Sequence, residues 1–526
     1  MKEVKHKPRF SVSMNTFDKA VAYFAPGLAK NRLKSRAVLS FLSAYDGASK
    51  SKRALKEFNP FGGDADSDTL PDLPSLRERS RDLDRNNPLA AGAIKTKITN
   101  VVGTGLRLQS RLDRDVLNLT DEQADALEAK IEREWRLFWE SKDCDVARTL
   151  NGHGITRMVY RQEKVNGDVF ILLPKITREG MPYDLKLQVI EADRVCNKNT
   201  MSDTETLAGG VEKDQYGAPL KYHILIHHPG NLFLATKAEW DIIDAFGKET
   251  GLRNIIHYYN PTRPGQSRGV PDLAPVIEIL KQLGRYTEAE VMAAVISGFF
   301  TVFVETESGE GDFDYTKMGD ELGRETSDKD YKLGNGMIVE LAKGDKIHDS
   351  NPGRPNQNFD NFVMSILRQI GVALEIPFEI LIKHFTASYS AARAALLELW
   401  KFVMAERRQL VDNFLKPVFE VWMYEAVAIE RVAAPGFFAD LAIKQAYLGC
   451  EFIGPTKGQI NEAVEVKAAG ERIKIGVSNL ARETAELIGE DWETNHKQQV
   501  KEHKKRLGDG LIEPPEPKGE KNVKPD

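Results

Sequence analysis

The chain of 526 residues is long enough to bury a large core and to form two to four domains. Its hydrophobic content of 41% and charged content of 29% are globular values, and its net charge of −5 argues against a protein whose main task is to grip nucleic acid. Its three cysteines lack CxxC spacing, and its longest apolar run, 14 residues at positions 291–304, is shorter than the roughly 20 residues that span a bilayer. We therefore expect a soluble, intracellular protein without a disulfide framework, a zinc site or a secretory signal.

The positive charge is concentrated at the N-terminus. Residues 1–60 hold 13 Lys/Arg against 4 Asp/Glu, an excess of 9 positive charges, which leaves about −14 for the remaining chain. Residues 1–56 are therefore predicted to form a basic arm with one helix near residues 30–45. The arm is either flexible and solvated, or it contacts a partner or DNA. Residues 57–76 are rich in Gly, Asp and Pro and are predicted to form a linker, so ordered structure is expected from Arg77 onward.

The next segment predicts two short helices and a turn. Asn87 is expected to cap the second helix, with Pro88 at its first position. Gly103-Thr104-Gly105 lacks the third glycine and the following helix of a nucleotide-binding loop, so we interpret it as a structural turn that leads into a strand.

A longer helix is predicted at residues 120–141, where Thr120 and Gln123 form a capping box. The aromatic and aliphatic side chains on one face of this helix are expected to lie in the core. They are Leu127, Ile131, Trp135, Phe138 and Trp139.

A further helix at 155–165 is followed by strands separated by Gly/Pro/Asp turns. The strands are predicted at 169–173, 185–190, 222–226 and 254–258.

Histidines are densest at His223, His227 and His228. His223 and His227 would share one face of a strand, which could suit a metal, but no carboxylate or cysteine accompanies them at ligand spacing. We therefore favour a structural role for them. His153 lies between two glycines and is expected in a loop.

The second half begins with a long helix at 272–297 and a strand at 299–304. The polar segment 305–358 is interpreted as a small α/β insertion with one strand at 337–341. A second helix follows at 359–374.

The following stretch combines an apolar segment with a long helix. Residues 376–388 are apolar and end in a Ser/Thr-rich turn, and 389–416 have helical spacing with Ser388 or Ser390 as N-cap. Pro417 is expected to end or kink this helix. Shorter helices are predicted after Pro435, and residues 508–526 are expected to be disordered.

Several segments carry a recognisable pattern. SYSAARAALLE (388–398) resembles the NYSSARAALLE signature of lambda-type bacteriophage portal proteins, with Ser388 in place of the usual Asn and Ala391 in place of one serine. The segments around 79–106, 190–195, 210–217, 263–271 and 452–465 are similar to other motifs of that family. The motif residues to which we assign a structural role are Arg79, Arg81, Asn87, Gly103, Gly105, Arg268, Gly269, Tyr389, Ser390, Arg393, Glu398, Gly454 and Pro455.

The resemblance implies an α+β, mainly helical portal fold that assembles into a ring, usually of twelve subunits. By order of elements, the expected regions are a wing at 77–271, stem helices at 272–298 and 356–375, a clip at 299–355, a tunnel loop at 376–388, a long wing helix at 389–434 and a C-terminal helical wing or crown at 435–507.

The resemblance also implies a function. Portal rings form the channel at one capsid vertex through which double-stranded DNA is packaged and ejected. Their partners are the terminase large subunit, the major capsid protein and the head-completion or neck proteins, and the ring is assembled in the host bacterial cytoplasm and becomes part of the virion. No catalytic residue, metal or cofactor is expected. The candidate channel residues in the tunnel loop are Lys383, His384, Thr386 and Ser388, although Lys383 could simply be solvated.

The sequence lacks the common motifs of enzymes. The chain has no HExxH, no GxSxG, no kinase motif set and no Cys/His dyad, and Pro455 occupies the lysine position of a Walker-like glycine pair at 449–454. A metal-dependent nuclease of a mobile element, built from dispersed carboxylates, remains the alternative. Another structural protein of the virion is a third possibility, and the series of motifs from 79 to 465 argues against it.

Overall fold

The computed structural model describes residues 16–42, 46–48, 52–60, 62–231, 238–298, 302–305, 346–349, 358–385, 388–459 and 461–512. The chain divides into two compact units, Met1–Asp64 and Ala65–Asp526. The described helices include none that is long and apolar enough to cross a membrane.

The N-terminal unit is a helical hairpin. Helix α1 (Thr16–Phe24) packs on α2 (Pro26–Leu42), and a 3-10 turn follows at Asp46–Ala48. Asp18 is buried and its carboxylate lies 3.3 Å from the guanidinium of Arg32. Helix α1 was not predicted, and α2 begins four residues before the one predicted helix. Pro26 stands at the first position of α2, where its fixed φ suits a helix and its missing N–H is not needed.

The larger unit also begins before the predicted start at Arg77. Helix α3 (Ala65–Thr69) and helix α4 (Leu73–Asn86) both start within the predicted linker. Helix α5 (Pro88–Val101) follows, and the Asn87 side chain accepts hydrogen bonds from the backbone N–H groups of Leu89 and Ala90 at 3.0 and 3.1 Å. The predicted cap is therefore confirmed.

The glycine turn and the long helix are also confirmed. Gly103 and Gly105 have φ values of +57° and +129° and lead into strand β1 (Arg107–Ser110). After α6 (Arg114–Leu117), helix α7 (Asp121–Trp139) opens with the predicted Thr120/Gln123 capping box. Ile131, Trp135, Phe138 and Trp139 are at most 2% exposed, whereas Leu127 is half-buried at the edge of the same core.

Helix α8 (Gly152–Asn166) contradicts one prediction. His153 lies in its first turn rather than in a loop. The Asn151 side chain accepts a hydrogen bond from the Gly154 N–H at 2.9 Å, so the helix starts three residues before the predicted position.

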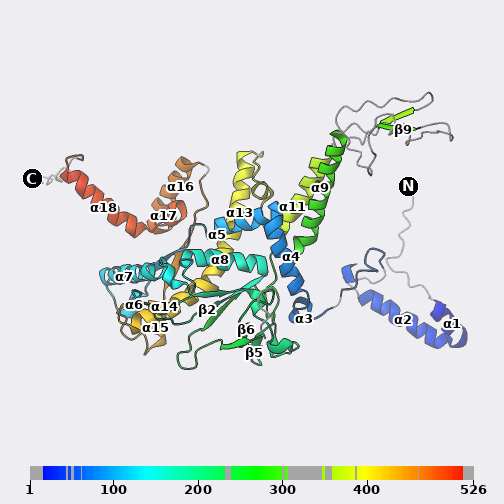
Figure 1. The fold of residues 1–526 in the computed structure, drawn as a ribbon, viewed down its shortest axis with the longest axis horizontal. Helices are drawn as coiled ribbons and strands as arrows, with labels where there is room; N and C mark the ends of the chain where they lie inside the picture. Colours follow the sequence, from blue (N-terminus) through cyan, green and yellow to red (C-terminus); the bar gives the residue numbers. More distant parts are fainter. Residues whose placement is uncertain are drawn as a thin grey trace, which may run out of the picture. The chain divides into compact units, whose positions relative to one another are not determined.

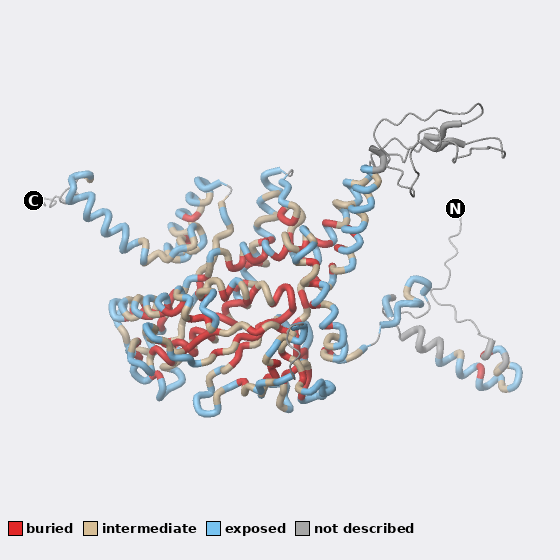
Figure 2. The backbone as a smooth tube through the Cα atoms, viewed as in Figure 1, coloured by how far each residue is buried: buried red, intermediate tan, exposed pale blue. Residues whose placement is uncertain are grey.

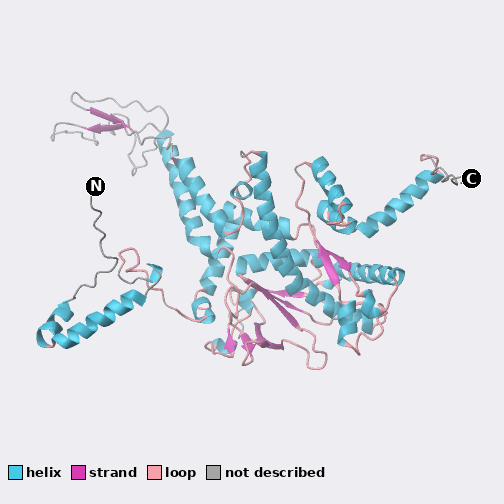
Figure 3. Ribbon diagram, turned by 180° about the vertical axis from the view of Figure 1, so that it is seen from behind, coloured by secondary structure: helices cyan, strands magenta, loops and turns pink. Residues whose placement is uncertain are grey.

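Two small antiparallel sheets follow (Figures 1 and 3). The first has the order β3-β2-β8, and the second has the order β4-β5-β6-β7. The strands are β2 (Asp168–Leu172), β3 (Gln188–Ile190), β4 (Leu207–Ala208), β5 (Val211–Lys213), β6 (Pro219–Leu225), β7 (Trp240–Asp244) and β8 (Ile255–Tyr259). Strands β2, β3, β6 and β8 confirm the predicted ones, and the short strands β4, β5 and β7 were not predicted. Short 3-10 turns lie at Lys142–Cys144, Ala192–Arg194 and Lys198–Thr200.

Strand β2 separates two hydrophobic cores because its side chains alternate between the faces of the sheet. Val169 and Ile171 face the main core, which the helices share, and Phe170 faces a smaller core with Tyr222 and Ile224 of the second sheet. Figure 2 shows the buried residues concentrated where the helices and sheets of this unit meet.

Helices α9 (Ile277–Gly298) and α11 (Phe359–Ala373) extend side by side away from the sheets (Figure 1). A 3-10 turn at Ala274–Val276, which contains Pro275, delays the start of α9 to Ile277. Strands β9 (Val302–Glu305) and β10 (Lys346–Asp349) pair antiparallel between the two helices in the chain. The predicted strand at 337–341 and most of the predicted clip lie outside the described residues.

The long helix does not end at Pro417, which was one of the two predicted outcomes there. Helix α13 (Tyr389–Leu410) runs through a π turn (Val411–Leu415) directly into α14 (Lys416–Ala428), so Pro417 does not end the helical segment. A π turn changes the hydrogen-bond register, and Pro417 lies in the first turn of α14, where its missing N–H is tolerated. Ser388 is the N-cap residue, but its side chain makes no capping hydrogen bond.

The C-terminal part is helical apart from one strand. Helix α15 (Leu441–Tyr447) precedes β11 (Cys450–Ile453), which pairs antiparallel with β1. Helices α16 (Glu462–Lys474), α17 (Leu480–Ile488) and α18 (Trp492–Gly508) follow. The predicted disordered tail falls mostly on residues 513–526, which lie outside the described residues. The unit as a whole is α+β and mainly helical, as predicted.

Candidate functional site

The first group of motif residues meets around Asp168, at the start of β2. This carboxylate is completely buried, and it accepts hydrogen bonds from Arg77 at 2.7 Å and from Arg268 at 2.5 Å. His257 Nε2 lies 3.2 Å from its second oxygen. Burial by itself would raise the pKa of Asp168, but the charges of Arg268 and Arg77 hold that pKa far below its usual value.

Arg268 connects three motifs through its guanidinium. Besides Asp168, it donates to the backbone carbonyl oxygens of Ala192, Val195 and Gly209 at 2.6–2.7 Å. Its charge also lies 5.0 Å above the ring of Phe170. The guanidinium is fully engaged in contacts within the protein, so its role is to join segments rather than to contact a ligand.

Gly269 and Arg81 complete this junction. A Cβ on Gly269 would lie 1.9 Å from the carbonyl oxygen of Gly167, so only glycine fits there. Arg81 of α4 forms ion pairs with Asp193 and, at 3.3 Å, with Glu191. Arg79, by contrast, is exposed on the other side of α4.

Sequence reasoning missed Arg77, because three alternating arginines on a helix suggest a solvated face. The signal lay in the helical spacing, since Arg77 shares the buried face of α4 with Leu73, Ser80 and Leu83.

The second group of motif residues meets at Arg407 of α13. Arg407 donates to the carbonyl oxygens of Asn100, Val101 and Pro455 at 2.9–3.1 Å. Burial lowers the pKa of this guanidinium to about 10. It therefore ties the long helix to the end of α5 and to the segment after β11.

The motif glycines are required by close contacts at this second junction. A Cβ on Gly454 would lie 2.5 Å from Leu106 and 2.8 Å from Arg407. A Cβ on Gly103 would lie 2.3 Å from Cγ of Pro455, and one on Gly105 would lie 2.2 Å from the ring of His153. These glycines allow close packing, and none of them lies in a phosphate-binding loop.

The candidate channel residues lie between α12 (Phe378–Leu381) and α13. Lys383, His384 and Ser388 are exposed, and Lys383 has a φ of +54°. Thr386 lies outside the described residues. Phe385, also in this segment, is 57% exposed, so the turn presents a mixed cationic and aromatic surface.

The signature helix α13 continues from this segment. Tyr389 and Ser390 are exposed, and the Ser390 hydroxyl lies 3.1 Å from that of Ser388. Arg393 is 4.0 Å from Glu465 of α16, and Glu398 pairs with Lys401 at 2.9 Å. Helix α13 thus supplies surface contacts at its start, where the signature lies, and the Arg407 junction near its end.

The histidine group does not form a metal site. His223 Nε2 lies 2.7 Å from Glu212 of the neighbouring strand, and its Nδ1 accepts from the Lys198 N–H at 3.3 Å. His227 is exposed beyond the end of β6, and His228 lies 3.5 Å from Glu191 and Asp193. Both nitrogens of His223 are used within the chain, which agrees with the expected structural role.

One group of carboxylates is close enough to hold a cation. Among the described residues, Asp125, Glu128 and Glu493 form the one such group. The guanidinium of Arg114 already lies 2.9 Å from Asp125 and 3.8 Å from Glu128, and Glu128 accepts the Leu112 N–H. Arg111 lies 3.7 Å from Glu493, so each of the three carboxylates already has a protein cation beside it.

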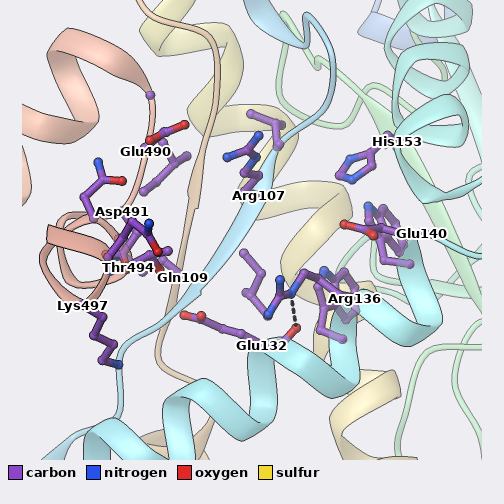
Figure 4. A pocket seen from close by; sticks show the side chains of 18 of the residues that line it. Arg107, Gln109, Glu132, Arg136, Glu140, His153, Glu490, Asp491, Thr494 and Lys497 are labelled. Carbon is purple, nitrogen blue, oxygen red and sulfur yellow. Dashed lines mark hydrogen bonds between the residues drawn. The ribbon is translucent and has the colours of Figure 1, made fainter. Parts of the chain in front are cut away.

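A cavity of about 770 Å³ lies between β1, α7 and the start of α18. Figure 4 shows side chains that line it. Its walls carry charges of both signs, including Arg107, Arg136, Glu132 and Lys497. Gln109 donates to Asp491 at 2.5 Å and so fastens α18 to β1 at the edge of this cavity. The Thr494 hydroxyl on its wall donates to Asp491 at 3.0 Å, but Asp491 is the N-cap of α18 and also accepts the Thr494 N–H, so this pair caps the helix. The cavity therefore gives no support to an enzyme site.

Comparisons with known proteins agree with the motif analysis. The family model described as "Phage portal protein, lambda family" matches residues 51–407. Portal protein B of Escherichia phage lambda is 26% identical over 480 residues, covering 88% of this chain and 89% of that protein. The portal protein of Escherichia phage N15 is 25% identical with the same coverage.

More distant matches include a probable portal protein of Halomonas phage phiHAP-1, which is 25% identical over 69% of this chain. Among solved structures, the neck of a native gene transfer agent (GTA) particle is 15% identical, with a TM-score of 0.39, and covers 79% of this chain and 93% of its own. The match of the family model to more than half of the sequence shows that this chain belongs to the lambda family of phage portal proteins.

Proposed function

We propose that this chain is the portal subunit of a bacteriophage, the connector between head and tail through which double-stranded DNA enters and leaves the capsid. The observation that carries this proposal is the family match over residues 51–407. That range ends at Arg407, whose guanidinium holds together the end of α5 and the segment around Pro455.

The proposal includes a ring of identical subunits, usually twelve in this family, at one vertex of the virion. The ring would be assembled in the host cytoplasm. It would bind the terminase large subunit during packaging, the major capsid protein at the vertex, and head-completion or neck proteins afterwards. A ring uses two different faces of each subunit, and long helices with exposed side chains, such as α9 and α13, are suited to such contacts.

The regions of the subunit follow from the order of the elements. Helices α9 and α11 pack side by side, with Tyr286 and Phe359 stacked at 5.5 Å, which supports their assignment as the two stem helices. Residues 299–355 connect them and would form the clip. Residues 77–271 and 389–434 would form the wing, and 435–507 the wing or crown.

The segment 376–388 is proposed to line the narrowest part of the channel. Lys383 and His384 are exposed there, and Ser388 follows at the start of α13. A channel in which DNA slides needs few cations, because each phosphate contact adds salt-dependent affinity. The charge of about −14 beyond residue 60 supports this proposal, since isolated cations in an acidic body make only brief contacts with the duplex.

We propose no catalytic activity for this chain. The alternative, a metal-dependent nuclease, needs carboxylates that are free to bind a metal ion. In the described carboxylate cluster, Asp125 and Glu128 pair with Arg114 and Glu493 pairs with Arg111, so no observation favours the nuclease.

The first experiment combines native mass spectrometry with negative-stain imaging of the purified full-length chain. A ring of about a dozen copies with an axial hole supports the portal proposal. A compact monomer or dimer that is stable across salt and protein concentration, and that cuts DNA with a divalent metal, would instead support the nuclease.

A further inference from the structure

A second cavity, of about 620 Å³, lies beside the Asp168 junction. Strands β5, β6 and β8 and the loop 261–267 surround it, and its volume is in the range of small-molecule sites. Three cations contribute to its wall: Lys213, Arg253 and Arg263. None of the described residues that line it is an Asp or a Glu, although the chain as a whole carries a net charge of −5.

Two of these cations are already balanced by acidic side chains outside the wall. Lys213 lies 3.0 Å from Asp66, and Arg263 lies 2.6 Å from Asp68, both on α3. Arg253 differs, because no described carboxylate lies within ion-pair distance of it. It is exposed, and its guanidinium contacts the ring of Phe246 at 5.0 Å. The cavity therefore has one unbalanced positive charge at its rim.

The floor of the cavity is aromatic and polar. The His257 ring is stacked between Phe170 at 4.1 Å and Tyr259 at 4.2 Å, and its Nε2 is held by Asp168. Tyr222 meets the edge of this stack at 5.9 Å. These contacts fix the positions of the rings before any ligand arrives.

The hydroxyl of Tyr222 has no partner within the described part of the chain. The residue is only 3% exposed and lines the cavity, and its hydroxyl makes no hydrogen bond to any described residue. The hydroxyl oxygen itself is not fully buried, so it remains accessible to solvent. Burial raises the pKa of Tyr222, so the hydroxyl keeps its proton and can donate it in a hydrogen bond. A donor without a protein acceptor can bind water or an acceptor atom of a ligand.

The loop that closes the cavity is rigid. The Gln266 side chain accepts hydrogen bonds from the N–H groups of Thr262 and Arg263 at 2.9 and 3.2 Å. The Tyr259 hydroxyl donates to the Gln266 carbonyl oxygen at 3.0 Å. The RPGQ segment at 263–266 thus forms a preformed part of the cavity wall.

We propose that this cavity binds an oxyanion, the phosphate or carboxylate group of a small ligand. Arg253 supplies the positive charge, and the Tyr222 hydroxyl donates a hydrogen bond to the anion. This site is separate from the candidate channel segment, and the proposal does not depend on ring formation.

The test is isothermal titration of the full-length protein with inorganic phosphate and, separately, with glutamate, in a buffer free of other oxyanions. Wild-type protein is expected to bind at least one of the two with a Kd of about 1 mM, and the tighter of the two identifies the source of the anion. Arg253→Gln should weaken binding about tenfold, because a charged hydrogen bond is lost. Tyr222→Phe should weaken it several-fold and leave the ring packing unchanged.

The matched control is Lys248→Gln, which removes one positive charge from a lysine whose side chain is 85% exposed and which does not line the cavity. It should bind like the wild type. The proposal is overturned if the wild type binds neither anion at about 10 mM. It is equally overturned if Arg253→Gln and Tyr222→Phe bind as well as the wild type, or if Lys248→Gln loses as much affinity as Arg253→Gln.

Discussion

Gly103 and Pro455 are in contact, although one follows α5 and the other follows β11: a Cβ on Gly103 would lie 2.3 Å from Cγ of Pro455. The neighbouring strands β1 and β11 pair in the same region, with Arg107 opposite Ile453. Two segments that are far apart in the sequence therefore pack against each other. Arg407 of α13 donates hydrogen bonds to backbone carbonyl oxygens in both of them.

This contact predicts that Gly103→Ala destabilises the protein. The substitution forces a side chain into a left-handed backbone position (φ +57°) and against Pro455, so we expect a loss of about 2–4 kcal/mol in the free energy of unfolding. Urea denaturation of the purified protein measures this loss. The control is Gly92→Ala in the middle of α5, where a new Cβ meets no atom within 4 Å. That variant should gain about 0.5–1 kcal/mol, and equal effects of the two substitutions would contradict the packing argument.

The Asp168 junction predicts that Arg268→Lys is not a conservative change. Lysine keeps the charge, but it cannot reach Asp168 and three backbone carbonyl oxygens at once. Because these groups are buried, we expect a loss of about 3–5 kcal/mol. The control is Arg79→Lys on the exposed side of α4, which should change stability by less than about 0.5 kcal/mol. Thermal unfolding of both variants measures the difference, and similar midpoints would show that the junction does not stabilise the fold.

Local signals in the sequence predicted much of this fold. The Asn87 cap, the Thr120/Gln123 capping box and the aromatic face of α7 are all encoded within a few residues, and each was confirmed. The pairing of β1 with β11 was not predicted, because a strand whose partner lies more than 300 residues away has no local signature. The π turn before Pro417 was missed for a different reason, since the sequence shows a proline but not the change in hydrogen-bond register that accommodates it.

The two arginines at the centre of the junctions were missed for the same physical reason. Arg77 and Arg407 look like surface charges in the sequence. Their acceptors are the carboxylate of Asp168 and backbone carbonyl oxygens, which are brought to them only when distant segments fold together. Motif glycines were easier to identify, but only the structure shows which atoms they face.

The buried carboxylate of Glu163 predicts a pH-dependent stability. It lies on α8, 3.2 Å from Lys164 and near Glu406 of α13. Burial raises its pKa to about 7, against 4.5 for an exposed group, even though Lys164 opposes the shift. The folded state therefore holds this proton more tightly than the unfolded state. The resulting stabilisation is fully present below pH 4.5 and is lost as the pH rises through about 7.

Glu163→Gln removes this dependence. The variant should be more stable than the wild type at pH 8 by about 1–3 kcal/mol, and the difference should shrink toward pH 5. Urea unfolding at several pH values measures it. Glu398→Gln, at an exposed carboxylate of α13, serves as the control and should change stability by less than about 0.5 kcal/mol. A constant offset between Glu163→Gln and the wild type at all pH values would rule out the titration of Glu163 as the cause.

The proposed channel segment makes a prediction about DNA rather than about stability. Lys383 is exposed in the turn before α13, so Lys383→Ala should leave folding and ring assembly intact. If this segment lines the channel, particles built with the variant should package or retain a different amount of DNA. The effect should diminish at high salt, where contacts between lysine and phosphate are screened.

Lys401→Ala is the matched control, because Lys401 is 76% exposed on α13 and pairs with Glu398. Imaging of the rings together with quantification of packaged DNA separates the outcomes. Loss of the ring in Lys383→Ala would place Lys383 at a subunit contact, and equal DNA content in both variants would place it away from the DNA path.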